Sequence, residues 1–227
     1  MELINHHKMK NNMNRTIYLL IGFLLISIST KAQSDPRASE LVDKVLKQVR
    51  SYDNIKVDFK YTLENKSEDI SQSTRGELQV KNELYRLKLM GATRIFDGEK
   101  LYTIVPADEE VTISDYNENE EDGISPSQML TFFEDGYLYK WEGENKDEGR
   151  VYQYIKLIPK DSKTEIKSIR LHIEKQTGNI HKLVQELKND TRTIVKVNKF
   201  KTDQPIPKKL FQFNKEKYAD YYINTIR

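Results

Sequence analysis

The chain of 227 residues contains no cysteine. This absence excludes a disulfide framework, a thiol nucleophile and a metal site built from cysteine ligands. It also excludes the attachment of a lipid to a cysteine behind a secretion signal, which is the usual tether of an exported bacterial protein. If the protein is exported, we expect it to work without such an anchor.

Histidine and glycine are scarce, and their positions offer little catalytic chemistry. Beyond the first 32 residues only His172 and His181 occur, and neither has the spacing of a metal ligand or of a catalytic triad. The nine glycines occur singly, so the sequence has no glycine-rich phosphate loop. We therefore predict a binding protein that is not an enzyme, with no catalytic residue, no metal and no cofactor.

The chain also lacks a long hydrophobic run. Its uncharged stretch, residues 17–29, holds 13 residues, whereas a membrane-spanning helix needs about 20. Basic residues precede this stretch, and Thr30-Lys31-Ala32 ends it with the small residues of a signal-peptidase site. The alternative is a retained membrane anchor. We predict a signal peptide of residues 1–32, cleaved before Gln33, and a single domain of residues 33–227.

Removal of the signal peptide changes the charge balance. The whole chain has a net charge of +2, but residues 33–227 contain 33 basic and 34 acidic residues, a net charge of −1. No basic excess is left that would indicate binding to nucleic acid. The mature chain is long enough to bury a real core as one domain.

The first element after the signal is an amphipathic helix. Asp35 is a suitable N-cap, and Pro36 suits the first helical position, where its missing N–H costs nothing. Apolar residues recur every three or four positions, while charged residues occupy the other side. The apolar stripe consists of Ala38, Leu41, Val42, Val45, Leu46, Val49 and Tyr52.

From Ile55 onward the apolar residues alternate with polar ones, which is typical of strands with one face in water. Eleven further strand candidates follow, the last at Leu210–Phe213, and turn signals such as Asp97-Gly98 separate most of them. The sequence therefore predicts a mainly β fold of about 10–12 antiparallel strands. A sheet of that size should curl.

One helical segment interrupts the strands. Ser125-Pro126 resembles a helix start, and a second short helix is predicted from the bulky apolar residues that follow, Met129, Leu130, Phe132 and Phe133. The acidic stretch between Asp115 and Ser125 matches no calcium loop, and we interpret it as a solvated loop, with a metal site as the alternative.

Two helices are too few to cover such a sheet. A curled sheet with a partial helical cover can leave an apolar hollow. The alternative is an ordinary packed core in which the same residues contact each other. The periodicity of the apolar residues favours neither the hollow nor the packed core.

Several short motifs follow one another in a recognisable order: RGELQVK (75–81), YRL (85–87), IFDGEKLYTIVP (95–106) and HIEKQTGNIHKLV (172–184). This order resembles that of the periplasmic lipoprotein carrier proteins of the LolA type, whose pattern contains G-x-L-x-V-K and D-G-K-x-L-x-x-Y-x-P. The resemblance covers nearly all of residues 36–214.

Two departures from the family pattern concern its lid and its aromatic motif. An Arg-Pro pair whose arginine helps to hold the family's lid is replaced here by Asn82-Glu83, and Arg86 is a candidate substitute. Ile104 stands where the family has tyrosine, with Tyr102 two residues earlier.

The resemblance implies a half-open antiparallel β-barrel with an α-helical lid over a hydrophobic cavity. It also implies a soluble periplasmic carrier, which we expect to be a monomer. Such a carrier takes acylated lipoproteins from an inner-membrane ABC complex of the LolCDE type to an outer-membrane acceptor that the sequence does not identify. The alternatives are a periplasmic sensor of the same fold and a carrier of another lipid.

On this interpretation, acyl chains would contact both the lid and the dry face of the sheet. The candidate lid residues are Leu41, Val45, Val49, Met129, Leu130, Phe132 and Phe133. The candidate sheet residues are Phe59, Tyr61, Leu78, Val80, Leu87, Leu89, Ile155, Leu157, Ile169 and Leu171.

Overall fold

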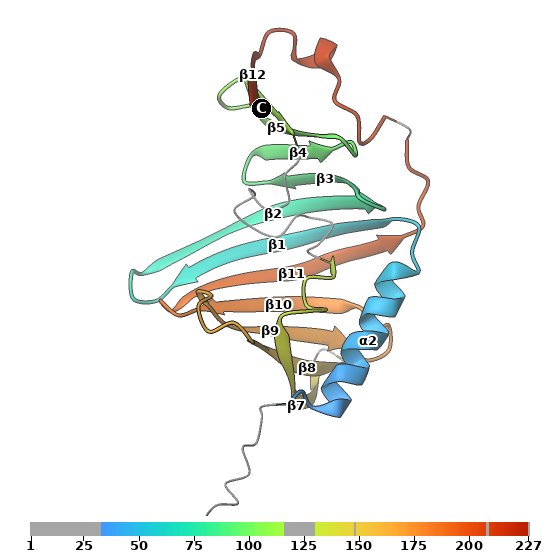
Figure 1. Cartoon of the computed structure of the whole chain (residues 1–227), viewed down its shortest axis with the longest axis vertical. Coiled ribbons are helices and arrows are strands. Elements are labelled where there is room, and N and C mark those ends of the chain that lie inside the picture. The colour runs from blue at the N-terminus through green and yellow to red at the C-terminus, as the bar shows by residue number, and fades with distance from the viewer. Residues whose placement is uncertain (1–32, 116–129, 148, 208, 227) are drawn as a thin grey trace, which may run out of the picture. The chain divides into compact units, whose positions relative to one another are not determined.

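The computed structural model describes residues 33–115 and 130–226, apart from 148 and 208. Residues 34–227 form one compact unit built on a twelve-stranded sheet (Figure 1). The predicted signal peptide, residues 1–32, lies outside the described residues.

The predicted amphipathic helix is present as α2 (Pro36–Arg50). The side chain of Asp35 accepts hydrogen bonds from the backbone N–H groups of Arg37 (2.8 Å) and Ala38 (3.4 Å), as an N-cap does. Pro36 occupies the start of the helix, as expected. Within the described residues no helix has the length and apolar character needed to cross a membrane.

The bounds of the twelve strands are β1 (Ile55–Asn65), β2 (Ile70–Lys81), β3 (Leu84–Leu89), β4 (Ala92–Phe96), β5 (Lys100–Val105), β6 (Glu110–Asp115), β7 (Tyr137–Asp147), β8 (Arg150–Pro159), β9 (Ile166–Glu174), β10 (Ile180–Leu187), β11 (Thr191–Thr202) and β12 (Tyr222–Ile226). Strands β1 to β11 lie where the sequence predicts strands, whereas β12 is not among the predicted ones.

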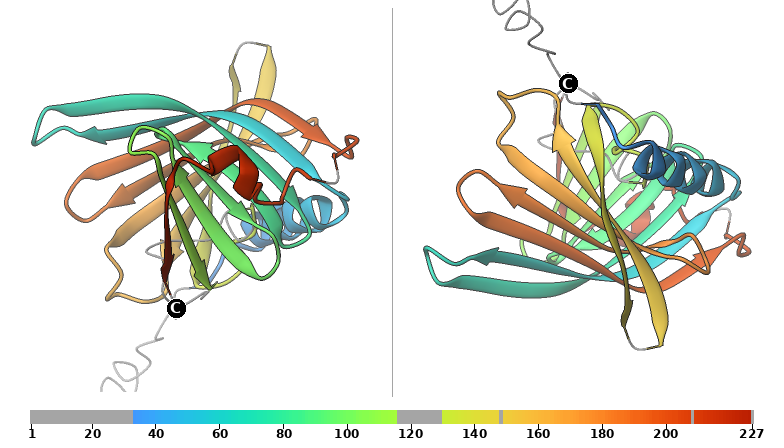
Figure 2. Two further views of the ribbon diagram at one scale, coloured as in Figure 1. Left: turned by 90° about the horizontal axis from the view of Figure 1, so that it is seen from above. Right: turned by 90° about the horizontal axis from the view of Figure 1, so that it is seen from below.

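The strand order in the sheet is β12-β6-β5-β4-β3-β2-β1-β11-β10-β9-β8-β7. Each neighbouring pair is antiparallel except β12 and β6, which are parallel. The sheet is twisted and curled, its two ends do not meet, and α2 lies against one face (Figures 1 and 2). The prediction of a half-open antiparallel barrel with a helical cover is therefore confirmed.

We call the face against α2 the inner face. Beneath the helix it carries five residues with 0% exposure: Ile155, Leu157, Ile169, Leu171 and Ile173. A second inner cluster covers β1 to β3 and includes Val57, Phe59, Leu78 and Val80. Full burial of one such side chain contributes about 1.5–3 kcal/mol, so both clusters stabilise the curled sheet.

A third apolar cluster lies on the opposite, outer face of β4 to β6. Its buried members are Ile95, Ile104 and Val111, and the C-terminal tail covers them with Phe213, Tyr218, Tyr221 and Ile223. The ring of Phe213 stacks on Tyr102 with centroids 4.8 Å apart. The 3₁₀ helix η2 (Lys215–Tyr218) lies in this tail, which then adds β12 to the edge of the sheet.

One prediction about local structure is wrong. The predicted strand Leu210–Phe213 is a turn, since this segment crosses the outer face instead of pairing. Only the end of the predicted second helix is described: Leu130 has a 3₁₀ conformation, and residues 131–136 form turns and bends in which the rings of Phe132 and Phe133 make a T-shaped contact at 5.4 Å. Met129 and the acidic stretch lie outside the described residues, apart from Asp115 at its start.

Candidate functional site

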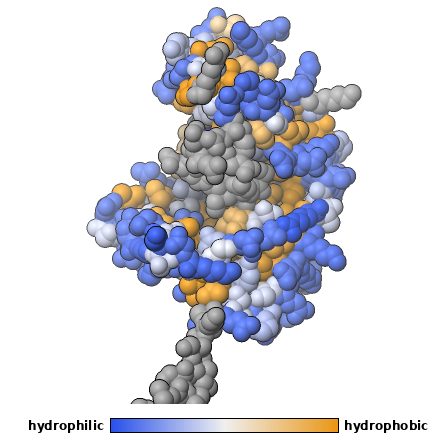
Figure 3. Space-filling view, in the orientation of Figure 1, coloured by the Kyte–Doolittle hydropathy of each residue, from blue (hydrophilic) through white to orange (hydrophobic). Residues whose placement is uncertain are grey.

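An apolar hollow of about 380 Å³ lies between the inner face of the sheet and the edge of its helical cover. The sheet side belongs to β1, β2, β3, β10 and β11, while Val45 and Val49 of α2 and Leu130 and Phe132 of the following segment form the cover. No charged side chain lines it among the described residues. Hydrophobic side chains also reach the surface in patches on the face seen in Figure 1 (Figure 3).

The alternation predicted for β1 to β3 is confirmed. Phe59, Leu78, Val80, Leu87 and Leu89 belong to one inner cluster. Eight of the predicted site residues line the hollow: Val45, Val49, Phe59, Tyr61, Leu78, Leu87, Leu130 and Phe132.

The other predicted residues lie elsewhere. Phe133, Ile155, Leu157, Ile169 and Leu171 have 0% exposure in the packed core beneath α2, because the helix covers β8 and β9 directly. Leu41 packs against the same core, whereas Val80 and Leu89 belong to the cluster over β1 to β3. Met129 is outside the described residues. Both alternatives thus occur side by side, a packed core under the helix and a hollow next to it.

Sequence reasoning missed much of the wall that the central strands form. Val57, Leu183, Val195, Val197 and Phe200 line the hollow. They do so because β1 pairs with β11, which in turn pairs with β10. The apolar alternation of these strands is visible in the sequence, but the pairing that brings them together is not.

Steric contact with a neighbouring strand explains why the RGELQVK motif has a glycine. Gly76 pairs with Phe59 of β1, whose ring lies across it. A Cβ atom at position 76 would come within 2.2 Å of Phe59 Cζ. The glycine therefore lets the Phe59 ring lie flat on β2, where it forms part of the wall.

The C-terminal end of α2 is fixed to the β9–β10 turn by one side chain. Gln48 Nε2 donates to the hydroxyl oxygen of Tyr52 (2.7 Å), the carbonyl oxygen of Thr177 (2.8 Å) and Asn179 Oδ1 (3.0 Å). Gly178 has a φ of +71°, and a Cβ atom there would lie 2.4 Å from Gln48 Oε1. The glycine allows both the turn and this close approach.

The N-terminal end of α2 is fixed to strand β7. The backbone N–H of Asp35 donates to the carbonyl of Tyr139 (2.8 Å), and the Tyr139 N–H donates to Ser34 Oγ (3.0 Å). The Arg37 guanidinium lies 3.8 Å from the ring centroid of Trp141, a cation–π contact. With both ends held, α2 is a fixed wall of the hollow.

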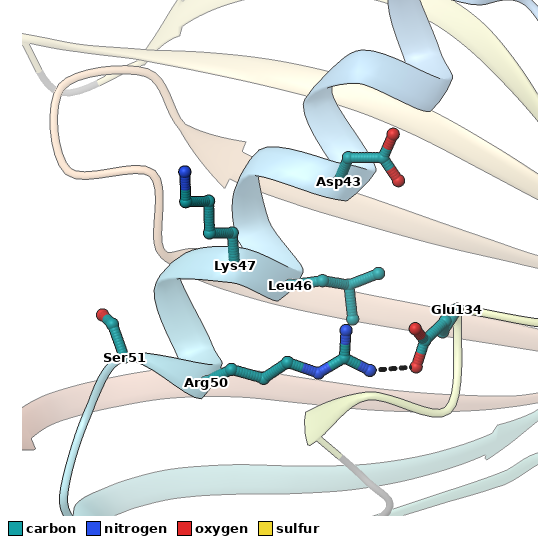
Figure 4. Close-up of a pocket in the computed structure, with 6 residues that line it drawn as sticks. All are labelled: Asp43, Leu46, Lys47, Arg50, Ser51 and Glu134. Atoms are coloured by element: carbon teal, nitrogen blue, oxygen red, sulfur yellow. Dashed lines mark hydrogen bonds and ion pairs between the residues drawn. The ribbon is translucent and has the colours of Figure 1, made fainter.

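An ion pair links α2 to the segment that follows residue 129. Arg50 pairs with Glu134 across a small surface depression, which Asp43 and Lys47 also line (Figure 4). The hydrogen bond from Arg50 lowers the pKa of Glu134. The single proton of the Tyr139 hydroxyl is shared between the carbonyl oxygens of Phe133 (2.7 Å) and Glu134 (2.5 Å).

The candidate role of Arg86 is not supported by its position. Tyr85 and Leu87 face inward, so alternation places Arg86 on the outer face, opposite Gln79 and Ile95 of its neighbouring strands. Among the described residues, Arg50 and Tyr139 make polar contacts to the cover segment.

His172 and His181, the two histidines beyond residue 32, do not line the hollow. His172 is on the outer face, as predicted, and its ring meets Tyr154 at 4.7 Å. Burial, with Lys182 and Arg170 nearby, lowers the pKa of His172 from 6.5 to about 4. The His172 ring is therefore uncharged near pH 7.

Comparisons with known proteins agree with this architecture. The family model for the outer membrane lipoprotein carrier protein LolA matches residues 50–214. A conserved protein from Thermus thermophilus has a similar structure, with 12% identity, coverage of 84% of this chain and 99% of the other, and a TM-score of 0.52. This likeness shows the fold alone.

Two further structures are similar at lower scores. The lipoprotein LppX of Mycobacterium tuberculosis has 13% identity, coverage of 77% and 99%, and a TM-score of 0.49. A LolA superfamily protein from Nitrosomonas europaea has 12% identity, coverage of 78% and 97%, and a TM-score of 0.42. None of the curated protein sequences matches the chain.

Proposed function

Because the chain belongs to the LolA family of outer membrane lipoprotein carrier proteins, we propose that it carries acylated lipoproteins between the inner and outer membranes. The observation that carries this proposal is the hollow itself. Its described lining holds no charged side chain, it lies open beside a helical cover, and it uses the strands that the family model spans.

The energetics of transfer favour a hollow of this kind. Each methylene group of an acyl chain exposed to water costs about 0.8 kcal/mol, so an unshielded chain does not cross an aqueous compartment readily. A site that buried every methylene of several chains would approach the practical ceiling of about 20 kcal/mol and would release its load too slowly. A partly open hollow binds the chain and still lets it leave.

The rest of the proposed pathway follows from the predicted signal peptide and from the resemblance to the carrier family. Cleavage before Gln33 would deliver the protein to the periplasm as a soluble monomer. The donor would be an inner-membrane releasing complex of the LolCDE type, and the acceptor would be at the outer membrane. Mass spectrometry of the mature protein tests the first step, which predicts an N-terminus at Gln33.

The decisive experiment measures lipoprotein release from inner-membrane vesicles by purified protein. We expect Leu183→Glu, which places a carboxylate in the hollow, to abolish release. Lys182→Glu changes the neighbouring residue, whose side chain faces outward, and should leave release unchanged. Thermal unfolding of both variants shows whether they are folded. Normal release by a folded Leu183→Glu variant would remove the hollow from the mechanism.

A carrier of another lipid is the second candidate, and the size of the hollow favours it. A water molecule takes about 30 Å³ in the liquid, and a methylene group is of similar size, so 380 Å³ holds on the order of a dozen such groups. That is less than a multiply acylated lipoprotein carries. Extraction of the native protein distinguishes the two, because a free lipid without lipoprotein would favour the second candidate.

A further inference from the structure

Apart from Tyr61 on β1, the polar side chains that line the hollow lie at its two ends. At one end, Gln48 and Asn179 stand where β10 begins. At the other end, Gln185 of β10 lies directly opposite Thr193 of β11. A strand rises about 3.3 Å per residue, so the two ends are roughly 20 Å apart, with apolar side chains between them.

The two ends differ in their hydrogen bonding. Gln48 donates to Asn179 and to the backbone of the same turn, so that pair is already satisfied within the protein. Neither side chain of the Gln185–Thr193 pair makes a hydrogen bond to another described residue. The amide and the hydroxyl together offer three N–H or O–H donors and two acceptor oxygens to whatever enters the hollow.

The charge around this pair restricts the ligand. The neighbouring residues Glu186 and Arg192 also lie opposite each other, but on the outer face, where Arg192 pairs with Glu64 at 3.6 Å and Glu186 with Lys167 at 3.1 Å. The hollow therefore has no cation among its described lining residues to meet an ionised carboxylate or phosphate. An ionised group without such a partner is costly to bury, whereas an uncharged carbonyl needs only hydrogen bonds.

Volume and length restrict the ligand further. Space for on the order of a dozen methylene-sized groups, arranged along roughly 20 Å, fits one extended acyl chain and not three.

We propose that the hollow binds a single acyl chain that is joined to its head through an uncharged carbonyl group, an ester or an amide, and that the Gln185–Thr193 pair hydrogen-bonds this group. The proposal rests on the proposed function in one respect, namely that the hollow takes acyl chains. Two kinds of ligand contain such a carbonyl group: a glycerolipid, as an ester, and an N-acylated protein, as an amide.

Binding is measured with the mature protein by displacement of the apolar dye N-phenyl-1-naphthylamine. The competing ligands are monomyristin, N-myristoylglycinamide and, at alkaline pH, myristate, which share one chain and differ in the head. We expect the two uncharged ligands to bind at least about tenfold more tightly than myristate, a difference of about 1.4 kcal/mol. Tighter binding of monomyristin would indicate a glycerolipid ligand, and tighter binding of N-myristoylglycinamide would indicate an N-acylated protein. Native mass spectrometry should show one ligand per chain.

Variants test the polar pair. The double substitution Gln185→Leu with Thr193→Val keeps the side-chain volumes close to the original and removes both hydrogen-bonding groups. It should abolish the preference for uncharged heads while the dye still binds. Thr62→Val is the matched control, because Thr62 is on the outer face of β1 and bonds to Ser73 there (3.0 Å). The control should keep the preference.

The possible failures are distinguishable. If neither the dye nor any acyl ligand binds, the proposed function fails and this inference fails with it. If acyl ligands bind but myristate binds as tightly as monomyristin, only the inference is overturned. It is also overturned if the double variant keeps the preference, or if two or more chains bind at once.

Discussion

Phe132 and Phe133 are adjacent in the sequence but serve different purposes. Phe133 has 0% exposure in the core beneath α2, while Phe132 lines the hollow. We expect Phe133→Ala to lower the free energy of unfolding by about 3–5 kcal/mol, because it leaves a cavity in a packed core. Phe132→Ala should cost clearly less, since its ring faces a space that already exists. Urea unfolding of both variants measures the difference, and equal losses would contradict the division between core and hollow.

His172 should make the stability depend on pH. Its pKa in the folded protein is about 4, below the value near 6.5 that the unfolded chain has. The unfolded state therefore binds the proton first as the pH falls, and stability is lost progressively between about pH 6.5 and pH 4. His172→Gln should flatten the change in unfolding free energy between pH 7 and pH 5, where most carboxylates are still ionised. His181, whose pKa burial also lowers, contributes in the same direction and is present in both proteins.

At the residue scale, the sequence predicts which face a side chain occupies but not what covers it. Alternation correctly placed Phe59 and Leu78 on the inner face, and also Leu157 and Leu171. It could not show that α2 lies over the last two and leaves the first two beside open space. That distinction depends on where a helix is fixed, which the Gln48 and Asp35 contacts decide.

The fixation of α2 can be tested at the scale of the element. Gly178→Ala would add a Cβ atom 2.4 Å from Gln48 Oε1 at a φ of +71°. We expect a loss of more than about 1 kcal/mol and faster amide hydrogen exchange at the C-terminal end of α2. Gly91→Ala is the matched control, with a φ of +79° and no atom within 4 Å of the added Cβ.

The Gly91→Ala control separates the effect of backbone strain from the effect of displacing Gln48. Both alanines adopt a left-handed backbone and share its cost, but only the one at 178 displaces Gln48. If exchange in α2 rises equally in both variants, Gln48 does not hold the helix.

Elements differ in how far the sequence predicts them. Helix α2 and strand β1 were predicted closely because cap, period and turn signals are all local. Strand β12 was missed, since Tyr222–Ile226 is short and its burial is low. Its pairing with β6 depends on residues far away in the chain. The segment 210–213 is rich in apolar residues and therefore resembles a strand in the sequence, but it forms a turn in which Phe213 packs on the outer face.

The C-terminal tail stabilises the molecule as a whole. The family match ends at residue 214, yet Tyr218, Tyr221 and Ile223 beyond it cover the outer cluster of Ile95, Ile104 and Val111. We expect a chain that ends at residue 214 to unfold at lower urea concentration, bind the dye ANS and self-associate, because it exposes this cluster and the edge of β6. Lys215→Ala with Glu216→Ala, in exposed η2, should behave like the full chain.

The strand order has a consequence for how the chain folds. The two halves of the sheet are built from hairpins between neighbouring strands, β1 to β6 on one side and β7 to β11 on the other. In the described sheet the pairing of β1 with β11 joins the halves, and β12 then returns to pair with β6. Local hairpins close short loops, whereas the central pairing must close a loop of most of the chain. The halves should therefore form early and join late, so refolding is slow, and the apolar hollow, whose walls come from both halves, is assembled at the last step.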